Sequence, residues 1–427
     1  MTLFFSLDFP IEVDCFIQLD FPSDYEASPA TLTSHNAILT SNQLVSAVPS
    51  GFFQTSTTST ITVVGSNGGV GGSVDQFIRY NTVTSPSLVK STGFFTLTLR
   101  DVGNQIIATN SDTLYIDETD IDPGSMTATI GLTTDLVQET SVAYTFTFTP
   151  SHDLVDDATY DPKIVINLPA GLALPAQGTC SISSVTGLDA GYTCSQPNNG
   201  ADNQIEITDP FGGTYTGGNQ VSFVISGITN AQVSGSAGTL QIYTMLNDGA
   251  DDYIVDGYES TTDIVMAAGI ITNGAVSGTS SVAYAEDVTY TIEFQPQHSV
   301  LQDGQVVVTL PDGMSFSDTS AAESGCTLNV TVGTPTCTVA GNVITFSDVF
   351  TSDLPSQLME LTIPGIQNVR YQGTSPSFVL STANEDGDVI DTVTSGFSAT
   401  TTSVTDITDA EIIIQDLPAV NGEDDDY

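Results

Sequence analysis

The feature that most constrains the fold is an internal repeat of short, strand-like segments. One copy reads YTFTFTP and then IVINLPAG, and a later copy reads YTIEFQP and then VVVTLPDG. Four pairs of segments match in the same order: 144–150 with 290–296, 164–171 with 306–313, 203–211 with 342–350, and 225–230 with 363–368. Self-similarity over such a length indicates a repeated structural unit. The sequence therefore predicts two copies of one domain.

The tripeptide Thr-Asp-Ile is interpreted as the joint between copies. It occurs at 119–121, 262–264 and 405–407, at intervals of 143 residues. A third, more diverged copy is expected at the front of the chain, where residues 17–22 fit the strand that ends in Leu-Pro and residues 94–107 fit the last hairpin. The predicted divisions are 1–118, 119–261, 262–404 and a final segment, 405–427.

Each copy reads as strands of alternating apolar and polar residues, separated by turn clusters. Examples of the turns are Asn-Asp-Gly at 247–249 and Glu-Asp-Gly at 385–387. Short strands at regular spacing with such turns are typical of a β-sandwich. We expect an all-β protein with three tandem immunoglobulin-like β-sandwich domains and an extra strand at the C-terminal end.

The charge is strongly one-sided, with 51 acidic residues against five Lys and Arg and a net charge of -46. Because phosphate binding needs clustered cations, this composition excludes nucleic acid as a partner. A halophilic host and an extracellular surface that carries calcium or glycans would both give this acidic, lysine-poor profile. The sequence contains no stretch of about 20 apolar residues, so it predicts no membrane span. Residues 1–16 lack the basic start and cleavage site of a signal peptide, so Met1 is expected near a mature or arbitrary start.

The two ends of the chain form a complementary pair in this interpretation. The complete copies begin with a strand, at 126–132 and 266–271, that the first copy is expected to lack. After the last Thr-Asp-Ile comes a spare strand whose donor residues would be Ala410, Ile412, Ile414 and Leu417. The candidate residues of the acceptor groove in the first domain are Leu3, Phe5, Leu7, Ile17, Leu19 and Phe21. A spare strand can complete such a sandwich by β-augmentation.

In organisation, the chain resembles pilus subunits that assemble by donor-strand exchange. The resemblance is carried by the missing first strand and by residues 410–417, and it implies a cell-surface filament that polymerises head to tail with copies of itself. In the chaperone-usher family the donor lies at the N-terminus, so the assembly machinery is not implied here. The repeats also resemble those of large tandem immunoglobulin-like surface proteins.

Two other interpretations stay open. The chain could be a segment of a long tandem-repeat adhesin or glycan-binding protein, in which every such strand is covalently supplied. Alternatively, the final strand could fold back onto the first domain of its own chain.

The cysteines indicate an oxidising compartment. Cys180 with Cys194 and Cys326 with Cys337 occupy the same loop of two copies, so each pair is expected to form a local disulfide. Metal binding is the alternative, but neither pair has the spacing of a zinc site. Two disulfides would place the protein outside the reducing cytoplasm. Cys15 has no counterpart and is either buried or free to bridge to another chain.

The sequence gives weaker indications of bound calcium and of attached glycans than of disulfides. Carboxylates gather at 117–122, 248–252 and 385–388, where they could bind calcium or simply form turns, and no other cofactor is expected. Asn329 begins the one N-glycosylation sequon that we find, and Ser/Thr runs such as 55–60 and 398–403 would suit O-glycans.

The sequence contains few residues in arrangements typical of a catalytic site. The chain has three histidines, of which His152 and His298 are equivalent by repeat and are expected to serve folding. His35 is expected in a polar Thr-Ser-His-Asn loop without a nucleophile motif beside it, and the glycine-rich residues 68–72 lack the lysine of a phosphate loop. We therefore expect a structural protein and no enzyme.

Overall fold

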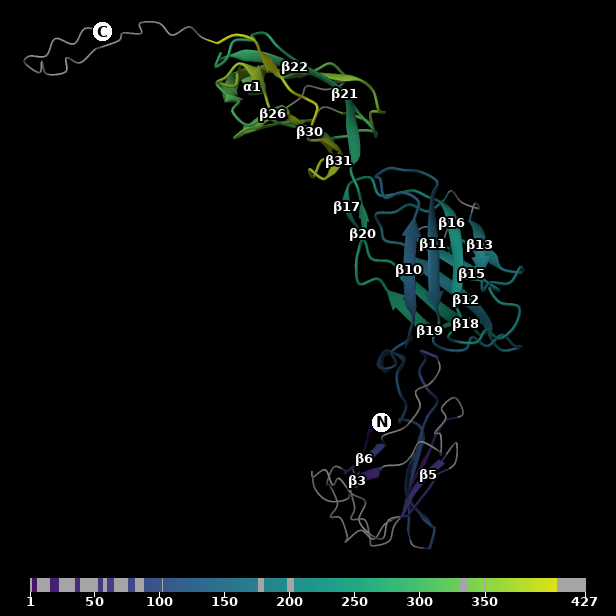
Figure 1. Ribbon diagram of the computed structural model, residues 1–427. Helices are drawn as coiled ribbons and strands as arrows, with labels where there is room; N and C mark the ends of the chain where they lie inside the picture. The colour runs from purple at the N-terminus through teal and green to yellow at the C-terminus, as the bar shows by residue number, and fades with distance from the viewer. Residues whose placement is uncertain are drawn as a thin grey trace, which may run out of the picture. The chain divides into compact units, whose positions relative to one another are not determined.

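Figure 1 shows the fold as a computed structural model. The structure describes residues 88–404 apart from 102, 176–179, 198–202, 331–335 and 349, and earlier in the chain residues 2–5, 16–22, 35–38, 53–56, 60–64 and 76–80. The chain divides into two compact units. One consists of Met1–Thr133, Ser141–Ile228 and Gly238–Asp263, and the other of Thr134–Thr140, Thr229–Ala237 and Ile264–Tyr427.

For description we keep the predicted divisions 1–118, 119–261 and 262–404 and call them the first, second and third domains. The second of these contains two sheets. The four-stranded sheet has the order β10 (Thr127–Leu132), β11 (Val142–Thr149), β16 (Val221–Ile228), β13 (Ser181–Thr186). The six-stranded sheet has the order β14 (Thr193–Ser195), β15 (Gln204–Thr208), β12 (Asp161–Asn167), β18 (Gln241–Asn247), β19 (Asp252–Glu259), β9 (Gly124–Ser125). Along β11 buried and half-buried residues alternate, because successive side chains of a strand point to opposite faces. Phe146 and Phe223 form part of the core, with ring centroids 5.7 Å apart.

The leading segment of this domain, β9 followed by β10, contributes to both sheets. β9 pairs in parallel with β19, the last strand, through Gly124 opposite Asp256. β10 then pairs antiparallel with β11 in the other sheet. One segment therefore covers an edge of each layer.

The third domain repeats this plan with a continuous leading strand. The order of its sheet is β24 (Ser315–Phe316), β28 (Met359–Gln367), β22 (Val288–Pro296), β21 (Gly269–Gly278), β31 (Val389–Val393), β30 (Val379–Ala383), β23 (Gln305–Thr309), β27 (Val343–Ser347), β26 (Thr336–Ala340), with β25 (Thr327–Leu328) also paired to β28. β21 pairs in parallel with β31 and antiparallel with β22, so it joins the two layers. A short helix, α1 (Thr319–Gly325), starts where the Asp318 carboxylate accepts a hydrogen bond from the Ala321 N–H.

Small elements lie between the main strands. They are the 3-10 helix η2 (Glu118–Asp120) and two two-stranded ladders, β17 (Gly235–Gly238) with β20 (Ile264–Met266) and β29 (Gly373–Thr374) with β32 (Thr400–Thr401). Two of the Thr-Asp-Ile tripeptides therefore differ in local structure, since Thr119 belongs to η2 and Ile264 begins β20. The third tripeptide lies outside the described residues.

The first domain has two smaller sheets. One has the order β1 (Thr2–Phe5), β6 (Gln76–Tyr80), β3 (His35–Ile38), and the other the order β4 (Phe53–Ser56), β5 (Thr60–Val64), β2 (Phe16–Asp20), β7 (Thr96–Arg100), β8 (Ile106–Asn110). Phe21 and Phe95 are buried and meet edge to face, with ring centroids 5.4 Å apart. The chain is thus an all-β protein built from tandem immunoglobulin-like sandwiches, as the sequence predicts. Among the described residues, no helix has the length and apolar character to cross a membrane.

Candidate functional site: the open edges of the first domain

Counting only the described strands, each sheet of the first domain has one strand fewer at one edge than its counterpart in the second domain. In strand order, β8 takes the place of β19, and β1 takes the place of β11. In the second domain β9 and β10 pair with the outer edges of those two strands. Within the described residues, no strand pairs with the outer edge of β1 or of β8. With respect to the described strands, these two edges are therefore the places where another strand could pair.

The last hairpin of each domain shows which residues are equivalent. All three hairpins have a register shift at the same place, directly after a pair of Cα partners. These pairs are Leu99 with Ala108, Thr244 with Asp256, and Thr382 with Asp391. On β8, Ala108 thus stands where the other domains have a buried aspartate, and Ile107 stands where they have Val255 and Ile390.

Exposure on the last strand differs sharply between the domains. Val255 and Ile390 are 2% and 0% exposed, whereas Ile107 is 40% exposed and its neighbour Ile106 is 59% exposed. Isolated exposed apolar residues are common on protein surfaces. Two adjacent exposed isoleucines on β8, whose outer edge pairs with no described strand, are a feature that a docking strand could cover.

In the second domain the position equivalent to Ala108 is occupied by Asp256, which belongs to a polar cluster. Asp256 is fully buried, and its carboxylate accepts hydrogen bonds from the backbone N–H groups of Ser151 and His152, each at 3.0 Å. The Ser151 hydroxyl also donates to it, and His152 Nδ1 lies 2.8 Å from Oδ1. A buried carboxylate needs such partners to offset its desolvation.

The third domain repeats the cluster. Asp391 is fully buried, accepts from the His298 N–H at 2.9 Å, and lies 2.7 Å from His298 Nδ1. In both domains the aspartate N–H donates to a buried threonine hydroxyl, Thr244 or Thr382, at 3.2 Å. The residue before His298 is Gln297, so a serine hydroxyl is not part of the shared arrangement. What the copies share is a contact that fixes the last strand against the end of β11 or β22.

A glycine of the leading strand completes each cluster. A Cβ on Gly124 would overlap Asp256 Oδ1 and the His152 ring, and a Cβ on Gly269 would overlap Asp391 Oδ1 and the His298 ring. We call Gly124, His152 and Asp256, and likewise Gly269, His298 and Asp391, the Gly-His-Asp clusters. The leading strand can approach the aspartate and the histidine ring this closely because its residue at that position is a glycine, which has no side chain.

Lys163 on β12 forms ion pairs with Glu206 on β15 and Asp252 on β19, so it connects three strands of the second domain. Its Nζ lies 2.7 Å from Asp252 Oδ2 and 3.1 Å from Glu206 Oε1. Burial acts to lower the pKa of Lys163, but these two carboxylates outweigh it and raise the pKa above the ordinary value. The third domain has Gln305 in the matching strand, so this ion pair is particular to the second domain.

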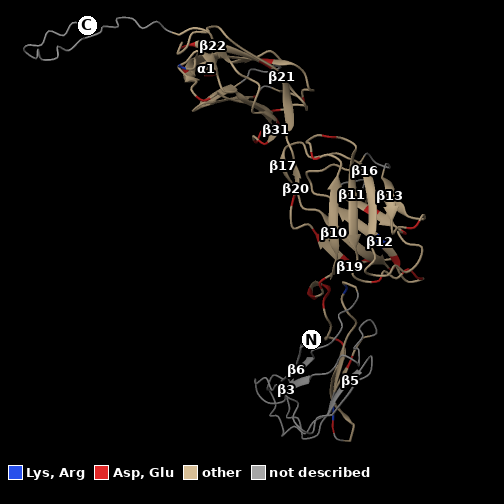
Figure 2. Cartoon of the chain, in the orientation of Figure 1, with Lys and Arg blue, Asp and Glu red and all other residues tan. Residues whose placement is uncertain are grey.

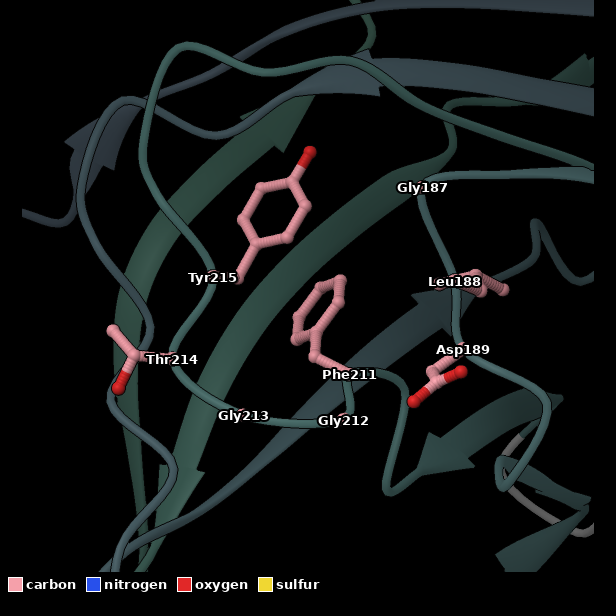
Figure 3. A pocket seen from close by; sticks show the side chains of 8 residues that line it. All are labelled: Gly187, Leu188, Asp189, Phe211, Gly212, Gly213, Thr214 and Tyr215. Atoms are coloured by element: carbon pink, nitrogen blue, oxygen red, sulfur yellow. The ribbon is translucent and has the colours of Figure 1, made fainter.

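A shallow hollow of about 410 Å³ on the second domain is a weaker candidate (Figure 3). The Phe211 and Tyr215 rings stack there with centroids 4.3 Å apart, and Asp189 lies across from them. Tyr215 pairs with Leu154 as Leu354 pairs with Val300 in the third domain. Because an aliphatic residue takes the same place there, the tyrosine ring is best explained by local packing.

In the described part of the chain, the acidic clusters are not arranged as metal-binding sites. Asp and Glu occur mainly in turns and at strand ends (Figure 2). No group of three or more His, Cys, Asp or Glu side chains among the described residues is arranged to bind a metal ion. Asp248 instead accepts from the N–H groups of Ala250 and Asp251, which lowers the pKa of its carboxyl as expected for a turn residue.

The residues predicted for the groove and the donor strand fall in different places. Leu3 and Phe5 lie on β1, Ile17 and Leu19 lie on β2, and Phe21 follows β2. Leu19 and Phe21 are buried in the core. Leu7 and all four donor residues (Ala410, Ile412, Ile414 and Leu417) lie outside the described residues. Ile106 and Ile107 were not predicted, although their place in the last hairpin was visible in the repeat.

Cysteine pairing and the sequon can be located directly. The structure joins Cys180 to Cys194 and Cys326 to Cys337, the pairing expected from the repeat, with Cα atoms 5.7 and 6.6 Å apart. Asn329 is exposed next to β25, and its side-chain oxygen accepts from the Glu360 N–H at 2.8 Å. The Asn329 side chain is thus accessible at the surface.

No protein-family description matches the sequence, and no curated protein matches it. Solved structures that resemble the chain include a C-terminal fragment of the major pilin GBS80 of Streptococcus agalactiae, at 14% identity and TM-score 0.23, covering 65% of this chain and 91% of that one. The full-length major pilin SpaD of Corynebacterium diphtheriae is 11% identical with TM-score 0.23, covering 87% and 79%. The Actinomyces fimbrial adhesin FimA is 11% identical with TM-score 0.20, covering 66% and 98%. At these scores the likenesses carry no argument about function.

Proposed function

We propose that this chain is a structural subunit of an extracellular filament. In this proposal, residues 410–417 of one copy add a strand to the first domain of the next copy. The observation that carries it is that, among the described strands, none pairs with the outer edge of β1 or of β8, whereas a leading strand covers the equivalent edges in the second and third domains. The exposed Ile106 and Ile107 on β8 support the same docking surface.

The energetics favour a stable contact. An added strand satisfies backbone N–H and C=O groups along the edge and places alternate side chains on the apolar face. Ala410, Ile412 and Ile414 alternate in the sequence, so they would share one face of the added strand. Each fully buried isoleucine contributes roughly 1.5–3 kcal/mol. A tail-to-head contact of this kind is heterologous, and its repetition gives an open polymer.

An extracellular location is part of the proposal. The two disulfides support it, because such bonds persist in oxidising compartments and are rare in the cytosol. Covalent glycans on Asn329 or on the Ser/Thr runs would be compatible with that location.

The test is a pair of full-length variants that differ only in which face of the tail they change. Ile412→Asp with Ile414→Asp should abolish polymerisation, because two charges would enter the apolar face, while the second and third domains stay folded. Ile413→Asp places a charge on the opposite face and should preserve polymerisation. Negative-stain microscopy and sedimentation velocity are the measurements.

Two results would contradict this function. One is filaments of normal length from the double variant. The other is a wild-type chain that stays monomeric at all concentrations with β8 already protected from hydrogen exchange, because its first domain would then be completed within one chain.

A further inference from the structure

We propose that the Gly-His-Asp clusters determine which strand each domain accepts, and that they direct the donor segment to the first domain alone. This inference rests on the proposed function and adds the specificity of that contact. One difference between the domains carries this inference. The second and third domains have the aspartate of the cluster, Asp256 or Asp391, at the position where β8 of the first domain has Ala108.

In the second and third domains, only a strand with glycine at one position can dock. There the leading strand lies against a buried aspartate and a histidine ring, and any Cβ would overlap both. The aspartate cannot move away without losing its hydrogen bonds from the histidine backbone and from Nδ1. An intruding side chain would therefore meet a steric clash and an unsatisfied buried carboxylate together.

The donor segment cannot meet that requirement. No glycine occurs between residues 405 and 421, so a Cβ would occupy the glycine position in whichever register the segment docked. Those two clusters therefore reject the tail of another copy, even when their own leading strand is transiently open. Rejection of a wrong partner by a built-in clash is a common source of specificity.

In the described hairpin β7–β8, the first domain has apolar groups at the places of the aspartate and the threonine, while the residues that follow β1 lie outside the described part of the chain. Ala108 replaces the aspartate, and its partner across the hairpin is Leu99 in place of the buried threonine. His35, the only histidine before His152, lies on β3, which corresponds in strand order to β13 and not to β11, the strand that His152 follows. A small alanine on β8 leaves room for a large residue on the incoming strand, which matches the isoleucines of the donor segment.

The experiment uses the full-length chain with Ile412→Asp and Ile414→Asp as acceptor, so that it cannot supply its own tail. The probe is a fluorescent synthetic peptide with residues 405–421, and fluorescence anisotropy gives its Kd. Ala108→Asp and Ala108→Leu should each weaken binding at least tenfold, because both fill the space on β8. Gln105→Asp, which adds the same charge in the turn outside β8, should leave the Kd within about twofold. Hydrogen exchange of β2 and β7 checks that the first domain of each variant is folded.

The outcomes separate the two proposals. Equal binding to the acceptor with and without the Ala108 substitutions overturns the selection mechanism and leaves the filament proposal standing. Weakening by Ala108→Asp alone also overturns it, because charge and not size would then be responsible. Protection of β19 or β31 in place of β8 by the peptide does the same. A peptide that binds no acceptor at all counts against the proposed function itself.

Discussion

At the scale of single residues, Gly124 and Gly269 define how closely a leading strand can approach the last strand of its domain. Both lie opposite a fully buried aspartate in a parallel pairing. Neither needs glycine for its backbone angles, because neither has a positive φ. The requirement comes from the space taken by the aspartate and histidine.

We expect Gly124→Ala to lower the free energy of unfolding by about 1–3 kcal/mol, the usual cost of forcing an extra group into a packed site. The matched control is Gly131→Ala on β10, where a Cβ would meet nothing closer than Thr145 Cβ at 3.8 Å. Chemical denaturation of both variants gives the comparison. Equal stability of the two variants would show that the cluster can rearrange at little cost.

The residues of the cluster were only partly predictable. The duplicated His152 and His298 were visible in the repeat, and a role in folding was inferred from the duplication. Gly124 and Gly269 could not be picked out among 37 glycines, because the reason for each lies on a strand more than 100 residues later. Only the register between the first and last strands brings these residues together.

At the scale of elements, β8 is the last strand of a hairpin whose counterparts, β19 and β31, are paired on both sides. β19 pairs with β18 and β9, and β31 pairs with β30 and β21. Of the strands that the structure describes, β7 alone pairs with β8. The same position along the strand is therefore in the core in two domains and at the surface in the first.

This difference predicts opposite outcomes for one substitution. Ile107→Lys should change the stability of the unassembled chain by less than about 0.5 kcal/mol, because Ile107 is 40% exposed, yet it should abolish polymerisation. Val255→Lys, at the equivalent buried position, should unfold the second domain because it buries an unpaired charge. Thermal melts and sedimentation velocity measure the two effects. Unfolding of the first domain by Ile107→Lys would mean that its edge is already packed.

Elements were easier to predict from sequence than single contacts. The alternating strands and the sandwich class follow from residue patterns of period two, which survive divergence between copies. Helix α1 was not predicted, because seven residues with one buried side chain, Ala322, give no helical periodicity. The Thr-Asp-Ile tripeptides were interpreted as equivalent joints, but the two described copies have different local structure, since an identical tripeptide does not ensure an identical backbone.

At the scale of the whole molecule, charge controls how readily copies approach one another. A net charge of -46 makes every encounter between copies repulsive. The Debye length falls from about 10 Å at 0.1 M salt to about 3 Å at 1 M. Polymerisation through an apolar strand should therefore be limited at low salt by repulsion and not by the docking contact.

We expect the rate of filament growth to rise with sodium chloride concentration over the range 0.05 to 1 M, because screening removes the repulsion. Light scattering during polymerisation at fixed protein concentration measures the rate. The Ile412→Asp, Ile414→Asp variant, measured in parallel, should show no growth at any salt concentration. A wild-type rate that falls with added salt would indicate that specific ion pairs drive association.

The parallel pairing of β21 with β31 has a mechanical consequence. In the third domain β21 and β31 run in the same direction, so the chain enters and leaves this ladder at opposite ends. Tension applied through the two ends of the domain would pull these strands past each other along their length and load their hydrogen bonds together, whereas an antiparallel terminal pair would open one bond at a time. Such a pairing is suited to bearing force, and the contact between His298 and Asp391 attaches β31 to the end of β22 beside this ladder.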